Sequence, residues 1–242
     1  ELKLKQFGFL NELQMINKRF EKALGAPARK AKEPMSQFYK DVAASIQKVT
    51  ETLLLKLVNI IQAKTGKTNL VFGGGVALNC VANAFINKES KFKSIRIHSA
   101  SGDSGCAMGA ALWRANQLNE EITLKNSEYL GPSYSEEQIE NTLKNIKNLK
   151  FHKCFKEELV EKVAQELSKD KVIGWFQGRM EFGPRALGNR SILASPKLPE
   201  MKRTLNLKIK KREGFRPFAP IILDSHFTEY FEDDNADYSR ML

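Results

Sequence analysis

Hydrophobic residues recur at helical spacing early in the chain. Steps of three and four residues place six of them on one face of a helix over residues 38–64: Val42, Ile46, Val49, Leu53, Leu57 and Ile60. Gly66 follows where a glycine commonly ends a helix. The pattern therefore predicts a long amphipathic helix that ends just before Gly66.

After this helix, short apolar runs alternate with clusters of small residues. Residues 69–72 run into a triple glycine at 73–75, and residues 94–98 run into a small-residue turn at 101–105. A helix is expected after each turn, the second over residues 106–117. A strand, a glycine-rich turn and a helix, present twice, predict an α/β fold.

The second half opens with a connector over residues 119–134, which Gly131 and Pro132 interrupt. Ser135 and Gln138 form a capping-box pattern at the start of a polar helix. The later elements are expected in this order: a helix over residues 157–168, a buried strand over 172–176, a basic helix around 201–209 and a strand over 221–223.

Residues 178–191, here called the arginine loop, set three arginines and one carboxylate among three glycines at the end of strand 172–176. The arginines are Arg179, Arg185 and Arg190, and the carboxylate is Glu181. Glycine allows a ligand to approach the backbone closely, and a guanidinium group binds two oxygens of a phosphate or carboxylate in one plane. The loop therefore predicts a site for a small oxyanion rather than a solvated basic loop.

Arg216 is expected to join this site. It precedes Pro217 and Pro220 in a segment that the two proline rings stiffen. Lys210, Lys211 and Arg212 are instead interpreted as the end of the preceding basic helix and are left outside the site: these residues fit a capping role.

Composition limits the classes of protein to consider. The 242 residues are 42% apolar and 28% charged, enough for one large or two modest globular domains, and no apolar run approaches the length of a bilayer-spanning helix. Cys80, Cys106 and Cys154 form no C-x-x-C pair, so we expect buried thiols and a cytoplasmic location. The first residue, Glu1, suggests a piece of a longer polypeptide.

The net charge of +11 is unevenly distributed. Residues 176–216 hold eleven Lys or Arg against three Glu, whereas residues 217–242 hold six acidic residues against one Arg. Basic charge can serve nucleic acid or a small polyanion, but no zinc-finger, RNP-type or Gly-x-x-Gly motif is present. Nucleic acid is therefore not favoured as a partner.

The triple glycine, Gly73, Gly74 and Gly75, precedes a helix expected to begin near Ala77 or Leu78. Backbone N–H groups at such a turn favour an anion, although a tight packing turn is an equal alternative. For Asp103, in the second turn, two interpretations stay open: ligation of a divalent metal, or capping of the next helix. The three histidines, which form no metal-binding pattern, are interpreted as structural or surface residues: His98, His152 and His226.

These motifs occur in the same order in the nodulation-protein-type O-carbamoyltransferases, the family that includes the enzymes that carbamoylate nodulation factors, tobramycin and cephem antibiotics. The chain resembles this family in residues 72–80, 101–111, 178–191 and 212–220. The resemblance runs from about residue 38 to the last residue, and the arginine loop is its most specific segment.

The resemblance implies a two-domain α/β fold. Residues 1–125 would form the C-terminal half of an actin/Hsp70-like (ASKHA) ATPase domain, and residues 126–242 an incomplete YrdC-like domain. In the family, carbamoyl phosphate and ATP give carbamoyl-adenylate at the YrdC-like domain. The carbamoyl group then passes to a hydroxyl of a sugar-like or natural-product acceptor at the first domain, which holds a divalent metal of the Fe²⁺ or Mg²⁺ type.

The resemblance also implies roles for residues that match its motifs. Carbamoyl phosphate would be bound by Arg179, Glu181, Arg185, Arg190 and Arg216, of which Arg185 and Arg216 form the catalytic pair. The nucleotide would lie along Gly73, Gly74, Gly75 and Asn79. Asp103 would ligate the metal, with most of the metal ligands outside this chain.

One departure and two alternatives accompany the resemblance. The family's metal-binding histidines lie upstream of any residue in this sequence, so the chain alone is expected to bind substrates without completing acyl transfer. The alternatives are a threonylcarbamoyl-adenylate pathway protein that acts on transfer RNA, and a non-catalytic phosphate- or nucleotide-binding module. No membrane partner is expected, and the acceptor and homodimer formation are left open.

Overall fold

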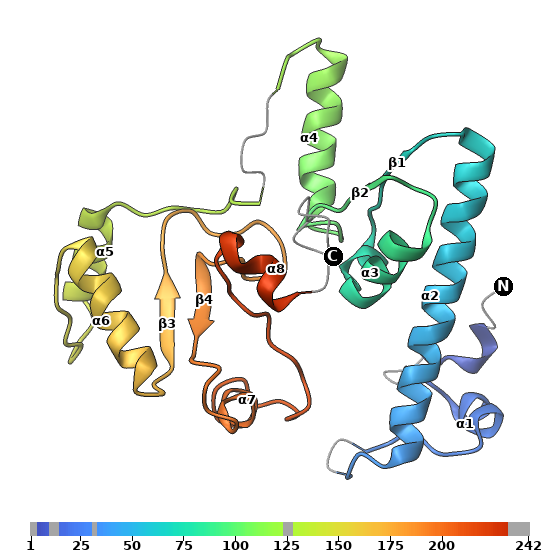
Figure 1. Cartoon of the computed structure of the whole chain (residues 1–242), viewed down its shortest axis with the longest axis horizontal. Coiled ribbons are helices and arrows are strands. Elements are labelled where there is room, and N and C mark those ends of the chain that lie inside the picture. Colours follow the sequence, from blue (N-terminus) through green and yellow to red (C-terminus); the bar gives the residue numbers. More distant parts are fainter. Residues whose placement is uncertain (1–3, 10–14, 31–32, 123–127, 232–242) are drawn as a thin grey trace. The chain divides into compact units, whose positions relative to one another are not determined.

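A computed structural model describes residues 4–9, 15–30, 33–122 and 128–231 of the chain. The chain divides into two compact units, Glu1–Ile61 and Gln62–Leu242. The first unit contains the short helix α1, Lys18–Leu24, and most of the long helix α2, Gln37–Thr65 (Figure 1). The Asn17 side chain accepts hydrogen bonds from the N–H groups of Arg19 and Phe20 and so caps α1.

Helix α2 confirms the long helix that the apolar spacing predicts. Gly66 ends it with φ +65° and donates its N–H to the carbonyl of Gln62 at 2.8 Å. The apolar face is nevertheless exposed along much of the helix, with Ile46 63% and Leu53 61% exposed, while Val58 is buried. Periodicity thus predicted the helix correctly but says nothing about whether its apolar face is covered.

The second unit begins with a parallel pair of strands, β1 (Asn69–Val71) and β2 (Ser94–Arg96). Helix α3, Cys80–Glu89, connects them, and helix α4, Gly105–Gln117, follows β2. The helix expected to begin near Ala77 or Leu78 begins slightly later, because the triple glycine first enters a 3₁₀ turn, Gly75–Leu78, and α3 starts at Cys80. The small core here is made by Ala77, Ala82, Ile86, Phe92, Ile95 and Ile97.

The rest of the unit holds helices α5 (Glu136–Lys144) and α6 (Lys156–Ser168), then the antiparallel strands β3 (Ile173–Phe176) and β4 (Arg190–Leu193), which place Phe176 opposite Arg190. The Ser135–Gln138 capping box is confirmed at the start of α5. Helix α7 (Met201–Thr204) continues into a π-helical turn, Leu205–Ile209, and α8 (Phe227–Tyr230) follows a 3₁₀ turn, Asp224–His226 (Figure 1).

Three expectations about burial and strands are wrong. Strand β3 is not buried: its residues alternate between half-buried and exposed because it belongs to a two-stranded sheet. Residues 221–223 form no strand, and the flanking Pro217 and Pro220 provide no N–H to a ladder. Cys80 and Cys106 are exposed thiols in the first turns of α3 and α4.

The described residues therefore form a mixed α/β structure with two small sheets. The finer assignment to an ATPase-type and a YrdC-like domain stays a prediction. Among the described helices, none combines the length and the apolar character that a membrane span requires.

Candidate anion-binding site

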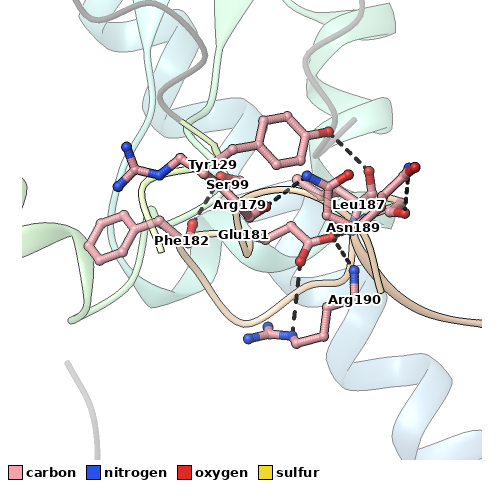
Figure 2. Close-up of polar contacts among 10 residues, drawn as sticks. Ser99, Tyr129, Arg179, Glu181, Phe182, Leu187, Asn189 and Arg190 are labelled. Carbon is pink, nitrogen blue, oxygen red and sulfur yellow. Dashed lines mark hydrogen bonds and ion pairs between the residues drawn. The ribbon is translucent and has the colours of Figure 1, made fainter. Parts of the chain in front are cut away.

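Glu181 lies at the centre of the arginine loop and is buried (Figure 2). Its Oε1 atom accepts hydrogen bonds from the backbone N–H groups of Leu187, Asn189 and Arg190 at 2.7, 2.8 and 3.1 Å. Burial by itself raises the pKa of Glu181, but these backbone hydrogen bonds outweigh burial and hold that pKa below its usual range. An ionised carboxylate therefore orders the loop.

The connector before α5 frames the other side of the loop. Arg179 donates from Nε to the carbonyl of Gly131 at 3.1 Å and from Nη2 to that of Leu130 at 3.3 Å. Tyr129 donates its hydroxyl to the carbonyl of Leu187 at 3.0 Å. The guanidinium group of Arg179 therefore holds the connector against the loop in this structure.

A pocket of about 540 Å³ opens beside the loop, against strands β3 and β4. Its lining is largely aromatic and aliphatic, and its two charged residues, Arg190 and Lys210, are both cations. The full lining consists of Gly174, Trp175, Phe176, Pro184, Ala186, Arg190, Ser191, Ile192 and Lys210. Cations in the wall of a pocket favour a small anion. The oxyanion site that the arginine loop predicts stays a prediction, and Arg190 is the loop arginine that the pocket lining includes.

Lys210 is a pocket residue that the sequence analysis left outside the site. The π-helical turn places it there, since the Lys210 N–H donates to the carbonyl of Leu205, five residues earlier, at 2.8 Å. Single π turns often occur at functional sites. The sequence offered no signal for this turn, because its residues are equally compatible with an α-helix.

Asn206, in the same turn, is fully buried and was also missed. Its side-chain N–H₂ donates to the carbonyls of Gly214 and Arg216 at 3.2 and 2.9 Å, and its oxygen accepts from Arg212 Nε at 2.7 Å. The Arg212 guanidinium also lies 5.0 Å from the ring centre of Phe218. Asn206 thus sets the path of the segment that carries Arg216.

Arg185 and Arg216, the expected catalytic pair, are not among the lining residues. Arg185 is exposed, although its neighbours Pro184 and Ala186 both line the pocket. Arg216 is exposed and forms an ion pair from Nε to Glu213 Oε2 at 2.8 Å. Of the five residues expected to bind carbamoyl phosphate, Arg190 is the one that the structure places in the pocket wall.

The two glycine-rich turns after β1 and β2, here called the paired turns (residues 73–75 and 101–105), lie together. The Gly74 N–H donates to the carbonyl of Ser101 at 2.7 Å. A side chain at Gly73, Gly74 or Gly75 would meet nothing within 4 Å. The backbone of the triple glycine therefore borders open space that a ligand can enter.

Asn79 and Asp103 complete the expected nucleotide and metal residues of this region. Asn79 caps α3, and its side-chain oxygen accepts from the Ala82 N–H at 3.1 Å. Asp103 is exposed, and Ser104 rather than Asp103 occupies the cap position of α4. No cluster of three or more His, Cys, Asp or Glu side chains suited to a metal occurs within the ranges that the structure describes.

A close junction joins the paired turns to the arginine loop. The Ser99 hydroxyl donates to the carbonyl of Phe182 at 3.3 Å, across 83 residues of sequence (Figure 2). Gly183 has φ +131°, and a Cβ added there would lie 2.8 Å from the carbonyl oxygen of Ser99. His98 supports the same segment by accepting the Ala100 N–H at Nδ1, at 2.9 Å, which is the structural role expected of it.

These features define the class of the protein: an α/β protein with a cationic pocket beside a glycine- and arginine-rich loop. Comparison with known families then identifies it. Residues 1–112 match the family model described as Carbamoyltransferase N-terminus, and residues 164–242 match Carbamoyltransferase C-terminus. The chain belongs to the carbamoyltransferase family, as its motifs predicted.

Relatives come from bacteria and archaea. The chain is 46% identical over 240 residues to the uncharacterized protein sll1178 of Synechocystis, covering 96% of this chain and 39% of that protein. It is 38% identical to Nodulation protein NolNO of Sinorhizobium fredii, over 82% of this chain and 30% of that protein. Protein MJ1058 of Methanocaldococcus jannaschii is 39% identical over 78% of this chain. The chain thus spans about two fifths or less of the length of these relatives.

Proposed function

We propose that this chain is the substrate-activating part of an ATP-dependent O-carbamoyltransferase. It would form carbamoyl-adenylate from carbamoyl phosphate, water and ATP, with release of phosphate and pyrophosphate. The carbamoyl group would then pass to a hydroxyl of a sugar-like or natural-product acceptor, with release of AMP. Family membership supports the transferase class. The observation that carries the proposal is the pocket beside the arginine loop, whose charged lining residues, Arg190 and Lys210, are both cations.

Carbamoyl phosphate is a compact anion, and its phosphoryl group suits this pocket. Arg190 can hold two phosphoryl oxygens with its planar fork, and Lys210 adds a point charge from the opposite segment. Charge builds up on oxygen as the mixed anhydride breaks, so fixed cations stabilise that stage more than the ground state. Arg185 and Arg216 would join from the rim, Arg216 by exchanging Glu213 for the ligand.

The paired turns suit the nucleotide. Gly73, Gly74 and Gly75 leave the backbone open on one side, and Gly74 is fixed by its hydrogen bond to Ser101. Phosphate oxygens can approach such a backbone without meeting a side chain. Asn79, which caps α3, would orient the start of that helix rather than contact the phosphates directly.

A divalent metal does not fit the described residues by themselves. Asp103 offers one exposed carboxylate, whereas oxygen-bound divalent metals take about six ligands. We therefore derive no step of the reaction through a metal. We propose instead that the isolated chain binds its substrates but does not complete acyl transfer, because it spans only 39% of its Synechocystis relative.

Calorimetric titration of carbamoyl phosphate tests the proposal. Arg190→Ala and Lys210→Ala should each weaken binding by about 10-fold to 100-fold, since one charge-assisted hydrogen bond contributes about 1.5–3 kcal/mol. Arg203→Ala removes an exposed cation of the same basic segment that is outside the pocket lining, and it should change the affinity less than about 2-fold. Equal losses of affinity in all three variants would show that the overall positive charge of the segment, and not the pocket, attracts carbamoyl phosphate.

The rim arginines are tested in the same series. Arg185→Ala and Arg216→Ala should weaken binding less than Arg190→Ala if the pocket wall carries most of the affinity. If they abolish binding while Arg190→Ala does not, the anion binds outside the pocket, at the rim. Absence of carbamoyl phosphate binding in a folded chain would overturn the proposal.

A further inference from the structure

The two carboxylate oxygens of Glu181 have different surroundings. Oε1 accepts three backbone hydrogen bonds. Oε2 is buried and accepts no hydrogen bond from the described residues, but lies 4.0 Å from Nε of Arg190. Buried polar atoms without a partner are rare and costly, so this oxygen requires an explanation.

Arg190 explains this oxygen, because Glu181 interacts with both the backbone and the side chain of Arg190. The Arg190 backbone N–H binds Oε1, and its side chain faces Oε2. Figure 2 shows the Nε edge of the guanidinium toward Glu181 and the two terminal nitrogens pointing away from it. One buried carboxylate therefore sets both the backbone and the side chain of the arginine that lines the pocket.

Arg179 and Arg216 lack such an arrangement, and Arg212, which buried Asn206 holds by Nε, is not in the pocket lining. The guanidinium group of Arg179 donates hydrogen bonds to the carbonyls of Leu130 and Gly131. Arg216 pairs with Glu213, whose side chain is 44% exposed. An exposed partner is exchanged easily with water, whereas the side chain of Glu181 has no exposed surface. Arg190 is the arginine of this group that combines a buried anchor with a place in the pocket lining.

We propose that Glu181 is a positioning residue for anion binding: it does not touch the substrate, and its Oε2 holds Arg190 by Nε so that both terminal nitrogens serve an oxyanion in the pocket. The identity of that anion as carbamoyl phosphate rests on the proposed function. The positioning of Arg190 does not, because it concerns residues of this chain alone.

Glu181→Gln separates the two roles of Glu181, which are to order the loop backbone through Oε1 and to hold the Arg190 side chain through Oε2. The amide oxygen still accepts the three N–H groups, which fixes the amide orientation, and the amide N–H₂ then replaces Oε2 and removes the attraction for Arg190. Glu137→Gln, at an exposed position in the first turn of α5, is the matched control. Inorganic phosphate is the probe, measured by calorimetry in the wild-type chain, each single variant and the double variant with Arg190→Gln.

Glu181→Gln should lower phosphate affinity by about 10-fold and Arg190→Gln by a similar factor. The double variant should bind phosphate no more weakly than the weaker-binding single variant, because both substitutions act through the guanidinium group of Arg190. Glu137→Gln should bind phosphate like the wild type. Multiplicative losses in the double variant, or wild-type affinity in folded Glu181→Gln, overturn the proposal.

A readout without ligand separates this inference from the proposed function. The Arg190 Nε–H signal in ¹⁵N NMR should be ordered in the wild type and mobile in Glu181→Gln, while the Leu187 and Asn189 amides stay protected from exchange. If the wild type binds neither phosphate nor carbamoyl phosphate, the proposed function fails. The Arg190 Nε–H signal then tests by itself whether Glu181 positions the Arg190 side chain. An unchanged Nε–H signal refutes it.

Arg190→Lys keeps the experiment decisive if Glu181→Gln does not fold. Lysine retains the charge but has no second edge by which Glu181 could hold it while its terminal nitrogen binds an anion. Phosphate affinity should fall about as far as in Arg190→Gln. Affinity equal to that of the wild type would show that charge alone matters and would refute the positioning role.

Discussion

The triple glycine and the arginine loop are both glycine-rich and both follow strands, yet they are built in opposite ways. At the triple glycine the backbone faces open space, and Asp103 in the second turn is exposed. The arginine loop is held from inside by Glu181 and from outside by the connector and Ser99. Glycine thus leaves the backbone open at residues 73–75, whereas at Gly183 it allows the arginine loop to pack tightly against Ser99.

This difference predicts where substitutions will be costly. In the arginine loop, Glu181, Asn189 and Gly183 have partners that a change would disturb, so losses of stability should be large at these positions. In the triple glycine, changes should affect ligand binding more than folding. The following predictions run from the largest expected effect to the smallest.

Glu181→Ala should have the largest effect. It leaves three backbone N–H groups without their acceptor and should lower the free energy of unfolding by roughly 3–5 kcal/mol. Urea denaturation followed by circular dichroism measures the change. Glu137→Ala, at an exposed helical position, should stay within about 0.5 kcal/mol of the wild type. If the two variants are equally stable, Glu181 does not order the loop.

Gly183→Ala should break the junction between the two regions. Its Cβ would lie 2.8 Å from the Ser99 carbonyl oxygen at a φ of +131°, and the expected loss is about 2–3 kcal/mol. Gly188→Ala has a φ of +106° without a close contact and should cost less, which separates backbone strain from collision. Gly109→Ala, inside α4 with open space, should instead be neutral or stabilising by about 0.5–1 kcal/mol.

Acidification should weaken the arginine loop. The pKa of Glu181 is lowered by folding, so its contribution is complete above the ordinary glutamate range near pH 4–5 and is lost as the pH falls through the lowered pKa. The stability difference between the wild type and Glu181→Gln should therefore shrink between about pH 5 and pH 3. Glu140 and Glu166, whose pKa values are also lowered by lysine partners, are present in both proteins and cancel. A difference independent of pH contradicts this prediction.

Gly75→Ala should have the smallest effect on folding. Gly75 has no positive φ, and its added Cβ would meet nothing within 4 Å, so the free energy of unfolding should change by less than about 0.5 kcal/mol. Nucleotide affinity, measured by calorimetry with ATP, should fall several-fold if phosphates approach this backbone. Unchanged affinity would place the nucleotide elsewhere. Gly74→Ala, at φ +100°, should also cost about 1–2 kcal/mol of stability.

The sequence by itself determined the features that depend on local chemistry. Apolar spacing and Gly66 predicted α2, Ser135 and Gln138 predicted the cap of α5, and the order of the glycine-rich motifs predicted the family. The two helix signals depend on residues within a few positions of each other, and the energies that they report act over the same range.

Tertiary structure decided the rest. The sequence contained the carboxylate of Glu181 but not its three amide partners, which the loop brings back from six to nine residues away. Lys210 and Asn206 gained their positions from a π turn, and Ser99 reached Phe182 from 83 residues away. Burial also followed from the environment: α2 left apolar residues exposed, and Cys80 and Cys106 face solvent. Contacts between distant segments depend on loop closure and packing, which no local pattern encodes.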